Sequence, residues 1–294
     1  MSVVVIGQIA GDLVLRTDGP PSTDYSVAVL QRNELLGGKG ANQAVGLAQL
    51  GVPVALIGVV GDDHAGAAVL QQAQRDGIDI GGVARRGTTA LLIDVVGRPA
   101  ERMLMEDVPE SSLVVVADLD RAASLFGAAD TVSIQLQQPT ATAMVAARRG
   151  RQRGLRVVAD GVPDPSIRAD LLAAVDVIRA DATEASLLAD REITTVERAR
   201  ELAEHLLACG PELAAIAVPG VGDLVAWRGG SEVFEFAKVK VIDPTGAGDA
   251  FVAGLIAALR DGATPREAGR RASSAAGATV QHLGGRPDLT ALRA

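Results

Sequence analysis

The stretch that decides the fold reads DPTGAGDAF and occupies residues 243–251. Before it, residues 238–242 (KVKVI) alternate like a strand, and after it residues 251–259 (FVAGLIAAL) are rich in helix formers and too apolar to face water. Gly246 and Gly248 permit backbone conformations that other residues resist. The sequence therefore predicts a strand, a tight glycine turn and a helix in that order.

The amides of Gly246, Ala247 and Gly248 would form an anion pocket at the N-terminus of this helix. Asp249 follows, where a carboxylate would repel a bound phosphate unless it has a chemical role. Accepting a proton from a hydroxyl that attacks a phosphoryl group in the pocket is such a role. Alternatively, Asp249 is only a first-turn acid favoured by the helix dipole. This stretch alone leaves both interpretations open.

Two common nucleotide-binding motifs are excluded. A dinucleotide fingerprint requires a third glycine where Phe251 stands. A Walker-type loop requires Gly-Lys followed by Ser or Thr, but Lys39 in the segment GGKG at residues 37–40 is followed by Gly40.

Composition narrows the function classes. The chain has 294 residues, of which 48% are hydrophobic, which is enough for a large core. The net charge of −8 and the aromatic content of 2% argue against nucleic-acid or anionic-membrane binding. A basic cluster at residues 148–153 is interpreted as a solvated helix end. The single cysteine excludes an internal disulfide and favours a reducing compartment, and the start of the chain is predicted to be a strand and not a signal peptide.

Buried strands and helices alternate along the chain, which predicts an α/β fold with a doubly wound, mostly parallel sheet flanked by helices. The expected strands are residues 3–6, 52–60, 132–136, 155–159, 175–178 and 213–218, and the expected helices are residues 37–50, 65–75, 141–151 and 195–207. Short alternating segments at about 12–36 and 88–105 are expected to form a small β lid. We expect one domain over residues 1–294.

DPTGAGDAF resembles the C-terminal signature of the ribokinase (PfkB) family of carbohydrate kinases, and GGKGANQA at residues 37–44 resembles its N-terminal signature. Weaker similarity extends over nearly the whole chain. The resemblance implies a ribokinase-like kinase that transfers the γ-phosphoryl group of ATP to a hydroxymethyl group of a small sugar. It also implies Mg²⁺, a monovalent cation such as K⁺ and a homodimer formed through the lid. The single cysteine, Cys209, predicts a cytoplasmic location.

The resemblance assigns roles to individual residues. Asp249 would be the general base, and the Gly246, Ala247 and Gly248 amides would stabilise the transferring phosphoryl group. The sugar would contact Asp12, Gly37, Gly38, Lys39, Asn42, Gln137 and Asp249. The nucleotide would contact Asp181, Glu184, Gly220, Gly222, Thr245, Gly246 and Gly248, with adenine near residues 275–281. Glu184 would act on Mg²⁺ through water, and Asp243 would help to bind the monovalent cation.

The chain departs from the family pattern at several of these places. Asp181 stands where Asn is usual, Ala10 replaces a usual Asn, and Gln137 replaces a usual Glu. In the phosphate loop, Val218 and Asp223 stand where a hydroxyl residue and a glycine are common. Ala10 and Gln137 are expected to line the sugar pocket, so the preferred sugar is expected to differ from ribose. A nucleoside kinase of the same fold and a binding protein that has lost catalysis remain as alternatives.

Overall fold

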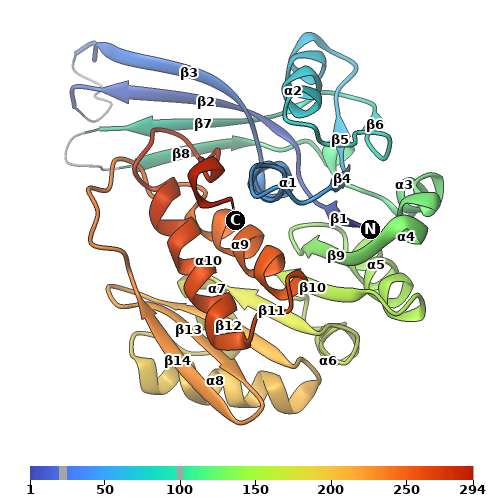
Figure 1. Cartoon of the computed structure of the whole chain (residues 1–294). Coiled ribbons are helices and arrows are strands. Elements are labelled where there is room, and N and C mark those ends of the chain that lie inside the picture. Colours follow the sequence, from blue (N-terminus) through green and yellow to red (C-terminus); the bar gives the residue numbers. More distant parts are fainter. Residues whose placement is uncertain (20–24, 98–101, 294) are drawn as a thin grey trace.

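The computed structural model describes residues 1–19, 25–97 and 102–293 and is built around an eight-stranded sheet (Figure 1). In spatial order the strands are β14 (Gly230–Glu235), β13 (Gly222–Trp227), β12 (Leu213–Val218), β11 (Val177–Ala180), β10 (Arg156–Asp160), β9 (Ala129–Gln135), β1 (Ser2–Ile6) and β4 (Val54–Ile57). The six from β12 to β4 are parallel, and β13 and β14 add an antiparallel edge. The predicted mostly parallel α/β sheet is confirmed.

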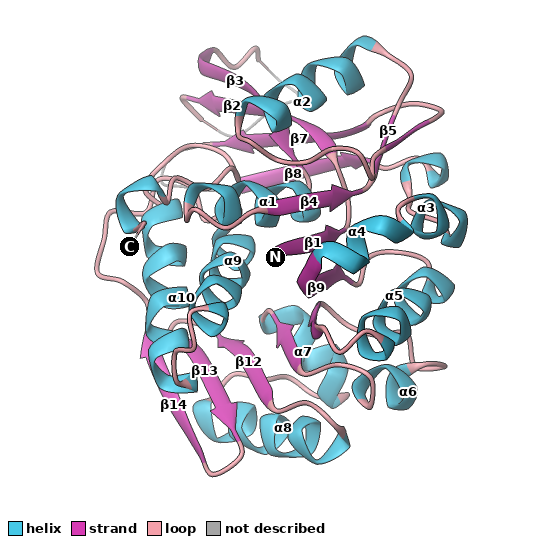
Figure 2. Ribbon diagram, turned by 45° about the vertical axis from the view of Figure 1, so that its right-hand side comes forward, coloured by secondary structure: helices cyan, strands magenta, loops and turns pink. Residues whose placement is uncertain are grey.

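Helices cover both faces of this sheet (Figure 2). One layer contains α1 (Lys39–Gln49), α2 (His64–Arg75), α9 (Ala247–Arg260) and α10 (Pro265–Thr279), and the other contains α3 (Val116–Arg121), α4 (Ala123–Ala128), α5 (Thr140–Gln152), α6 (Arg168–Leu172), α7 (Ala182–Ala189) and α8 (Val196–Cys209). In β1, Val3 and Val5 belong to the hydrophobic core between the sheet and the layer that contains α1, whereas Val4 and Ile6 belong to the core on the opposite face. All four side chains are completely buried. Burial on both faces explains why the parallel strands are continuously apolar. Two short 3₁₀ turns, Glu110–Ser112 and Thr290–Leu292, complete the elements.

A second, four-stranded sheet forms the lid. Its strands are, in order, β3 (Val29–Gly37), β2 (Ala10–Thr17), β7 (Ala90–Val96) and β8 (Arg102–Asp107). β2 and β7 are parallel, and the outer pairs are antiparallel. These strands fall in the two segments where a lid is predicted, although residues 20–24 and 98–101 of those segments lie outside the described residues. A separate parallel pair, β5 (Val59–Val60) and β6 (Ala84–Arg85), flanks α2 in the sequence.

The prediction of a strand at residues 238–242 is wrong. The chain crosses this segment as a loop between β14 and α9, because the edge of the sheet is already formed by the β13–β14 hairpin. Its apolar residues find no core, and Val241 is 47% exposed. Phe236, Ala237 and Val241 of this loop instead form part of a cavity wall. The alternation of KVKVI therefore does not correspond to a sheet strand.

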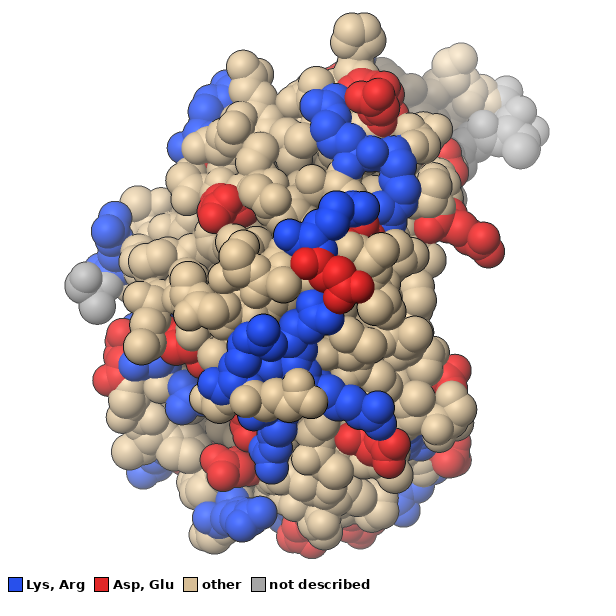
Figure 3. All heavy atoms as spheres, turned by 90° about the vertical axis from the view of Figure 1, so that its right-hand side faces the viewer, with Lys and Arg blue, Asp and Glu red and all other residues tan. Residues whose placement is uncertain are grey.

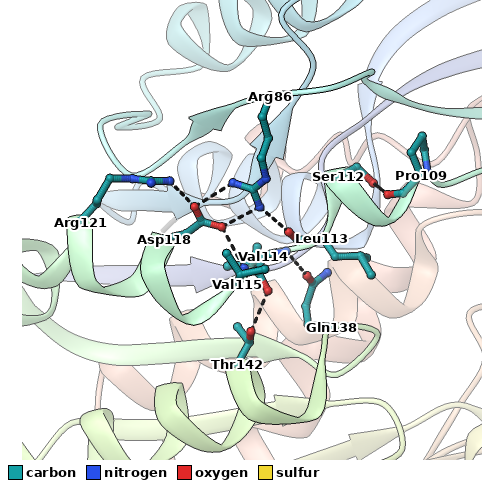
Figure 4. Close-up of polar contacts among 10 residues, drawn as sticks. All are labelled: Arg86, Pro109, Ser112, Leu113, Val114, Val115, Asp118, Arg121, Gln138 and Thr142. Atoms are coloured by element: carbon teal, nitrogen blue, oxygen red, sulfur yellow. Dashed lines mark hydrogen bonds and ion pairs between the residues drawn. The ribbon is translucent and has the colours of Figure 1, made fainter.

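The chain that returns from the lid is fixed to the body by buried polar contacts (Figure 4). Arg86 donates to both carboxylate oxygens of Asp118, each at 2.9 Å. The Val114 amide donates to Gln138 Oε1 at 2.8 Å, and Thr142 donates to the Val114 carbonyl at 2.7 Å. These contacts hold the segment after β8 against the body of the protein.

The face shown in Figure 3 carries a band of Lys and Arg with acidic side chains between and beside them. Arginines near the end of α5 form ion pairs with aspartates of neighbouring elements: Arg148 with Asp170, Arg149 with Asp120 and Arg151 with Asp176. The basic cluster at residues 148–153 is thus balanced by acids, which fits a solvated helix end. No helix in the described ranges combines the length and the apolar character needed to cross a membrane.

Candidate active site

A cavity of ≈ 680 Å³ lies between the lid, the start of α1 and the first turn of α9. It brings together the two glycine-containing motifs that the sequence separates. Asn42 from the first motif donates to Asp249 from the second, with 3.0 Å between Nδ2 and Oδ2, although 207 positions separate the two residues. The cavity is therefore the place to test the predicted site residues.

The turn before α9 is shaped by glycine. Gly246 has φ of +74°, and a Cβ there would lie 1.9 Å from the Gly285 carbonyl oxygen. The first close helical hydrogen bond runs from the Ala250 amide to the Gly246 carbonyl at 2.9 Å. The Gly248 and Asp249 amides precede that bond, so they belong to the unpaired first turn of a helix. This geometry suits an anion.

Asp249 lies in this first turn with only 6% of its surface exposed. Burial and, to a lesser degree, Asp160 raise the pKa of its carboxyl to about 7, against the lowering effects of Lys39, Asn42 and Arg179. A carboxylate whose pKa lies near neutral pH is suited to accept a proton during turnover. The structure therefore places Asp249 with the environment that a general base needs.

Two buried oxygens in the cavity wall have no partner in the described parts of the chain: Oδ1 of Asp12 and Oδ1 of Asn42. Both side chains are 4% exposed, and leaving such an atom unpaired costs about 1–3 kcal/mol. Gly37 lets Asp12 approach, because a Cβ at Gly37 would lie 1.9 Å from Asp12 Cγ. Burial, together with Asp94 and Asp249, raises the pKa of Asp12 to about 8. A ligand with hydroxyl groups would satisfy both oxygens.

Lys39 and Glu184 meet across the site. Lys39 Nζ donates to Glu184 Oε1 at 2.9 Å. The other oxygen of Glu184 accepts from the Asp181 amide at 2.8 Å, and the Glu184 amide donates to Asp181 Oδ1 at 2.8 Å. This capping box starts α7, so the motif has a structural role as well. Lys39 and Asp181 line the cavity, while Glu184 lies just behind the wall.

Of the glycines of the predicted phosphate loop, Gly220 lies in the turn between β12 and β13, and Gly222 is the first residue of β13. Gly220 has φ of +70°, and a Cβ at Gly222 would lie 2.1 Å from the Phe234 carbonyl oxygen. Neither glycine is part of the cavity wall, but Ala217 and Asp223 beside them are. Burial raises the pKa of Asp223 to about 6, against the lowering effect of Arg179.

Among the other residues predicted to bind the nucleotide or the cation, some line the cavity and one is buried behind its wall. Thr245, Gly246 and Gly248 line the cavity together with Ala276, Gly277 and Val280 from the expected adenine segment. Asp243 is completely buried behind them. Its Oδ1 accepts from the Thr245 amide at 2.9 Å and hydroxyl at 2.5 Å, and its Oδ2 accepts from the Gly284 amide at 2.9 Å.

The two residues that depart from the family pattern and were expected in the sugar pocket, Ala10 and Gln137, occupy different positions relative to the cavity. Gln137 lines the cavity together with Gly38 and Asn42, but Ala10 is completely buried and is not part of the wall. The expectation that Ala10 lines the pocket is therefore wrong. An ion pair of the lid was not predicted: Arg102 Nε donates to Asp94 Oδ1 at 2.5 Å, and both residues face the cavity. In the sequence, Asp94 was only a polar residue interrupting a short strand.

Sequence reasoning also missed a buried polar cluster formed by Gln43, Asp160 and Arg179. Asp160 accepts from Gln43 at 2.9 Å and from Arg179 at 3.2 Å. Arg179 lines the cavity. Each residue comes from a different element, and only the pairing of β10 with β11 and the position of α1 unite them.

The cavity thus combines a buried carboxyl group whose pKa is near 7, a helix turn suited to an anion, and unpaired oxygens of Asp12 and Asn42 that can accept from hydroxyl groups. This combination is typical of a phosphotransferase that acts on an alcohol. Comparison with known proteins agrees. Residues 1–292 match the family described as "pfkB family carbohydrate kinase". The chain therefore belongs to the pfkB family of carbohydrate kinases and is a transferase with the ribokinase-like fold.

Relatives cover nearly the whole chain. The ribokinase of Haemophilus influenzae is 28% identical over 293 residues, covering 98% of this chain and 95% of that protein. The ATP-dependent ribose-1-phosphate kinase of Halopiger xanaduensis is 30% identical over 271 residues, with 90% and 87% covered. The structure of Arabidopsis thaliana ribokinase complexed with ribose and ATP superposes with a TM-score of 0.81 at 23% identity, covering 99% of this chain and 97% of that one.

Proposed function

We propose that the protein transfers the γ-phosphoryl group of ATP to the hydroxymethyl group of a small sugar. The observation that carries this proposal is the position of the unpaired Asp12 and Asn42 oxygens in the same cavity as Asp249. Asp12 and Asn42 would bind sugar hydroxyls and direct one primary hydroxyl toward Asp249. This orientation supplies the proximity that phosphoryl transfer requires.

Asp249 would accept the proton as the hydroxyl oxygen bonds to the γ-phosphorus. The bond from that phosphorus to the bridging oxygen then breaks, and ADP leaves with the electron pair. The amides at the start of α9 would stabilise the charge on the transferring group. Lys39 lies on the same cavity wall and adds positive charge.

The residues at the site fit Mg²⁺. The acidic residues Asp181 and Asp223 line the cavity, and Glu184 contacts the Asp181 backbone amide from behind the wall. Mg²⁺ keeps several waters and uses few protein carboxylates beside substrate phosphates. The described residues accordingly include no group of three or more acidic, His or Cys side chains arranged as a metal cage. When bound, the ion would neutralise charge on the phosphates.

The sugar is expected to differ from D-ribose. Gln137 presents an amide that donates as well as accepts, and the Asp94–Arg102 pair adds charged groups to the lid side of the cavity. A pocket that bonds hydroxyls discriminates strongly between sugars. We expect an ADP-release assay over pentoses, hexoses, deoxy sugars and nucleosides to give a higher kcat/KM for another sugar than for ribose.

Each other outcome of this assay has a distinct meaning. A clear preference for ribose would show that the specificity inference is wrong. Turnover of nucleosides alone would favour the nucleoside kinase, and binding without turnover would favour the inactive binding protein.

We expect K⁺ to activate the enzyme more than Na⁺. Asp243 is buried, has no Lys or Arg partner in the described ranges, and keeps an accepting site on Oδ2 beside the single Gly284 contact. A buried unpaired carboxylate favours a cation nearby. Rates measured in KCl and NaCl at equal ionic strength test this expectation, and equal rates in the two salts would count against it.

The lid supports the proposal of a homodimer. Four of its apolar side chains are about half exposed: Val29 (51%), Leu30 (50%), Met103 (46%) and Met105 (46%). Light scattering is expected to give twice the chain mass of 30.1 kDa, and Met103→Glu should lower it by placing a charge in the interface. A mass of one chain for the unmodified protein would exclude this dimer.

The single half-buried cysteine, Cys209, supports a cytoplasmic location.

A further inference from the structure

The guanidinium of Arg179 lies directly against the anion-binding turn. Arg179 is on β11, is 7% exposed and lines the cavity. A Cβ built on Gly248 would lie 2.5 Å from Arg179 Nη2 and 2.8 Å from Cζ. Glycine at position 248 therefore allows a permanent positive charge to pack on the first turn of α9. Arginine remains protonated at any physiological pH.

A chain of buried hydrogen bonds fixes this guanidinium. Arg179 Nη1 donates to Asp160 Oδ1 at 3.2 Å, and Gln43 Nε2 donates to Asp160 Oδ2 at 2.9 Å. Ser133 Oγ donates to Gln43 Oε1 at 2.9 Å. Ser133, Gln43 and Asp160 are at most 1% exposed. Support from β9, α1 and β10 holds Arg179 in one position, as preorganised catalytic groups require.

The guanidinium keeps donors that the described chain does not use. Nη1 faces Asp160, and its distance to Glu184 Oε2 is 3.9 Å. Nε is buried without a partner among the described residues, and no hydrogen bond from Nη2 is found in the described ranges. A charged donor that is buried and unpaired is costly, so a structural role as the partner of Asp160 does not account for the whole side chain.

The charge around Arg179 allows an alternative explanation. Asp160, Glu184, Asp223 and Asp181 all hold the pKa of Arg179 above its usual value, against the effect of burial. Arg179 would then serve only to neutralise these acids. If Arg179 only neutralises Asp160, removing both charges together should do little further harm beyond removing the Asp160 charge alone. If Arg179 has another role, its loss should still be harmful when Asp160 is neutral.

We propose that Arg179 is a further catalytic residue, whose Nη2 donates to a non-bridging oxygen of the γ-phosphoryl group during transfer. The inference rests on the proposed kinase function. Arginine suits the task because its planar fork can donate to Asp160 and to a phosphate oxygen at the same time. The donor sits beside the amides of α9, so both would stabilise the same developing charge.

The test uses Arg179→Met, Arg179→Lys, Asp160→Asn and the double variant Asp160→Asn/Arg179→Met. We expect Arg179→Met to lower kcat by about 10²–10³-fold, with partial recovery in Arg179→Lys. The double variant is expected to stay as slow as Arg179→Met. A double variant that returns to the kcat of Asp160→Asn would show that Arg179 only neutralises Asp160 and would overturn the proposal.

Folding is controlled in the same set. The double variant leaves no uncompensated charge on residue 160. Its kcat can therefore be compared with that of Asp160→Asn even if Arg179→Met alone fails to fold. Arg260→Met is a matched control, because Arg260 pairs with Asp130 away from the cavity, at 2.7 Å between Nη2 and Oδ2. We expect this control to lower Tm and leave kcat unchanged.

A second readout needs no sugar. Loss of a γ-phosphoryl contact should weaken ATP binding about tenfold while ADP binding changes less than about threefold, since a charged hydrogen bond is lost only with ATP. Equal weakening of both nucleotides would contradict the proposal. If no sugar is turned over by the unmodified enzyme but the ATP-to-ADP affinity ratio falls in Arg179→Met, the proposed function fails and the Arg179 contact stands.

Discussion

Asp249→Asn is expected to lower kcat by about 10²–10⁴-fold while folding and nucleotide binding stay near normal. Asparagine keeps the shape of the side chain and an oxygen that can accept from Asn42 Nδ2. It cannot take up the proton of the attacking hydroxyl. Steady-state kinetics together with ADP affinity separate loss of the base from loss of binding.

Asp130→Asn is the matched control, because Asp130 is also a partly buried carboxylate but pairs with Arg260 outside the cavity. It should change stability and not kcat. The pH profile provides a second check: the pKa of Asp249 is raised to about 7 and the deprotonated form is the base, so kcat/KM should fall as pH drops below about 7. A near-normal kcat in Asp249→Asn, or an acid limb near pH 4, would contradict the assigned role.

Asp12→Asn is expected to lower kcat/KM for the sugar by about 10²-fold or more, with little change in the KM for ATP. Oδ1 of Asp12 is the acceptor without a partner among the described residues, and an unmade hydrogen bond at a buried group costs about 1–3 kcal/mol. The neutral amide replaces one acceptor with a donor. Initial rates over a matrix of sugar and ATP concentrations measure both constants.

The same substitution should make the free protein more stable. Burial and the neighbouring Asp94 and Asp249 raise the pKa of Asp12 to about 8, so above the usual pKa the unfolded chain ionises at Asp12 while the folded protein keeps the proton, and stability falls. The folded-state proton stabilises at low pH, and this contribution is lost as pH rises to about 8. The gain in Tm of Asp12→Asn over the unmodified protein should therefore grow from pH 5 to 8. A lower Tm with unchanged sugar kinetics would show that Asp12 is structural.

The parallel strands of the main sheet were predictable because they are buried on both faces and read as continuous apolar runs, as Val3 to Ile6 do. The antiparallel edge formed by β13 and β14 was not predicted. The turn before α9 was predictable because Gly246 and Gly248 permit backbone conformations that other residues resist. The segment 238–242 was predicted wrongly because a short alternation of apolar and polar residues also occurs in loops, as it does here. The organisation as one domain stays a prediction.

The site was predictable where a local motif carries it and not where distant strands create it. Lys39, Asn42 and Asp249 lie on the two motifs, Asp12 lies shortly after the first apolar run, and the structure brings all four to one cavity. Arg179 is a single polar residue in a buried strand, and its position depends on the register that pairs it with Asp160. No local pattern encodes that register, so the buried ion pair became visible only in three dimensions.

The central claim is tested most directly by identifying the product of one turnover. The enzyme is incubated with ATP, Mg²⁺ and the best sugar of the panel, and the phosphate ester is examined by ³¹P NMR with proton coupling. The account predicts a phosphate coupled to the two protons of a hydroxymethyl carbon, formed in equal amount to ADP and absent with Asp249→Asn. Release of ADP with free phosphate only, or an ester at a ring hydroxyl, would contradict it.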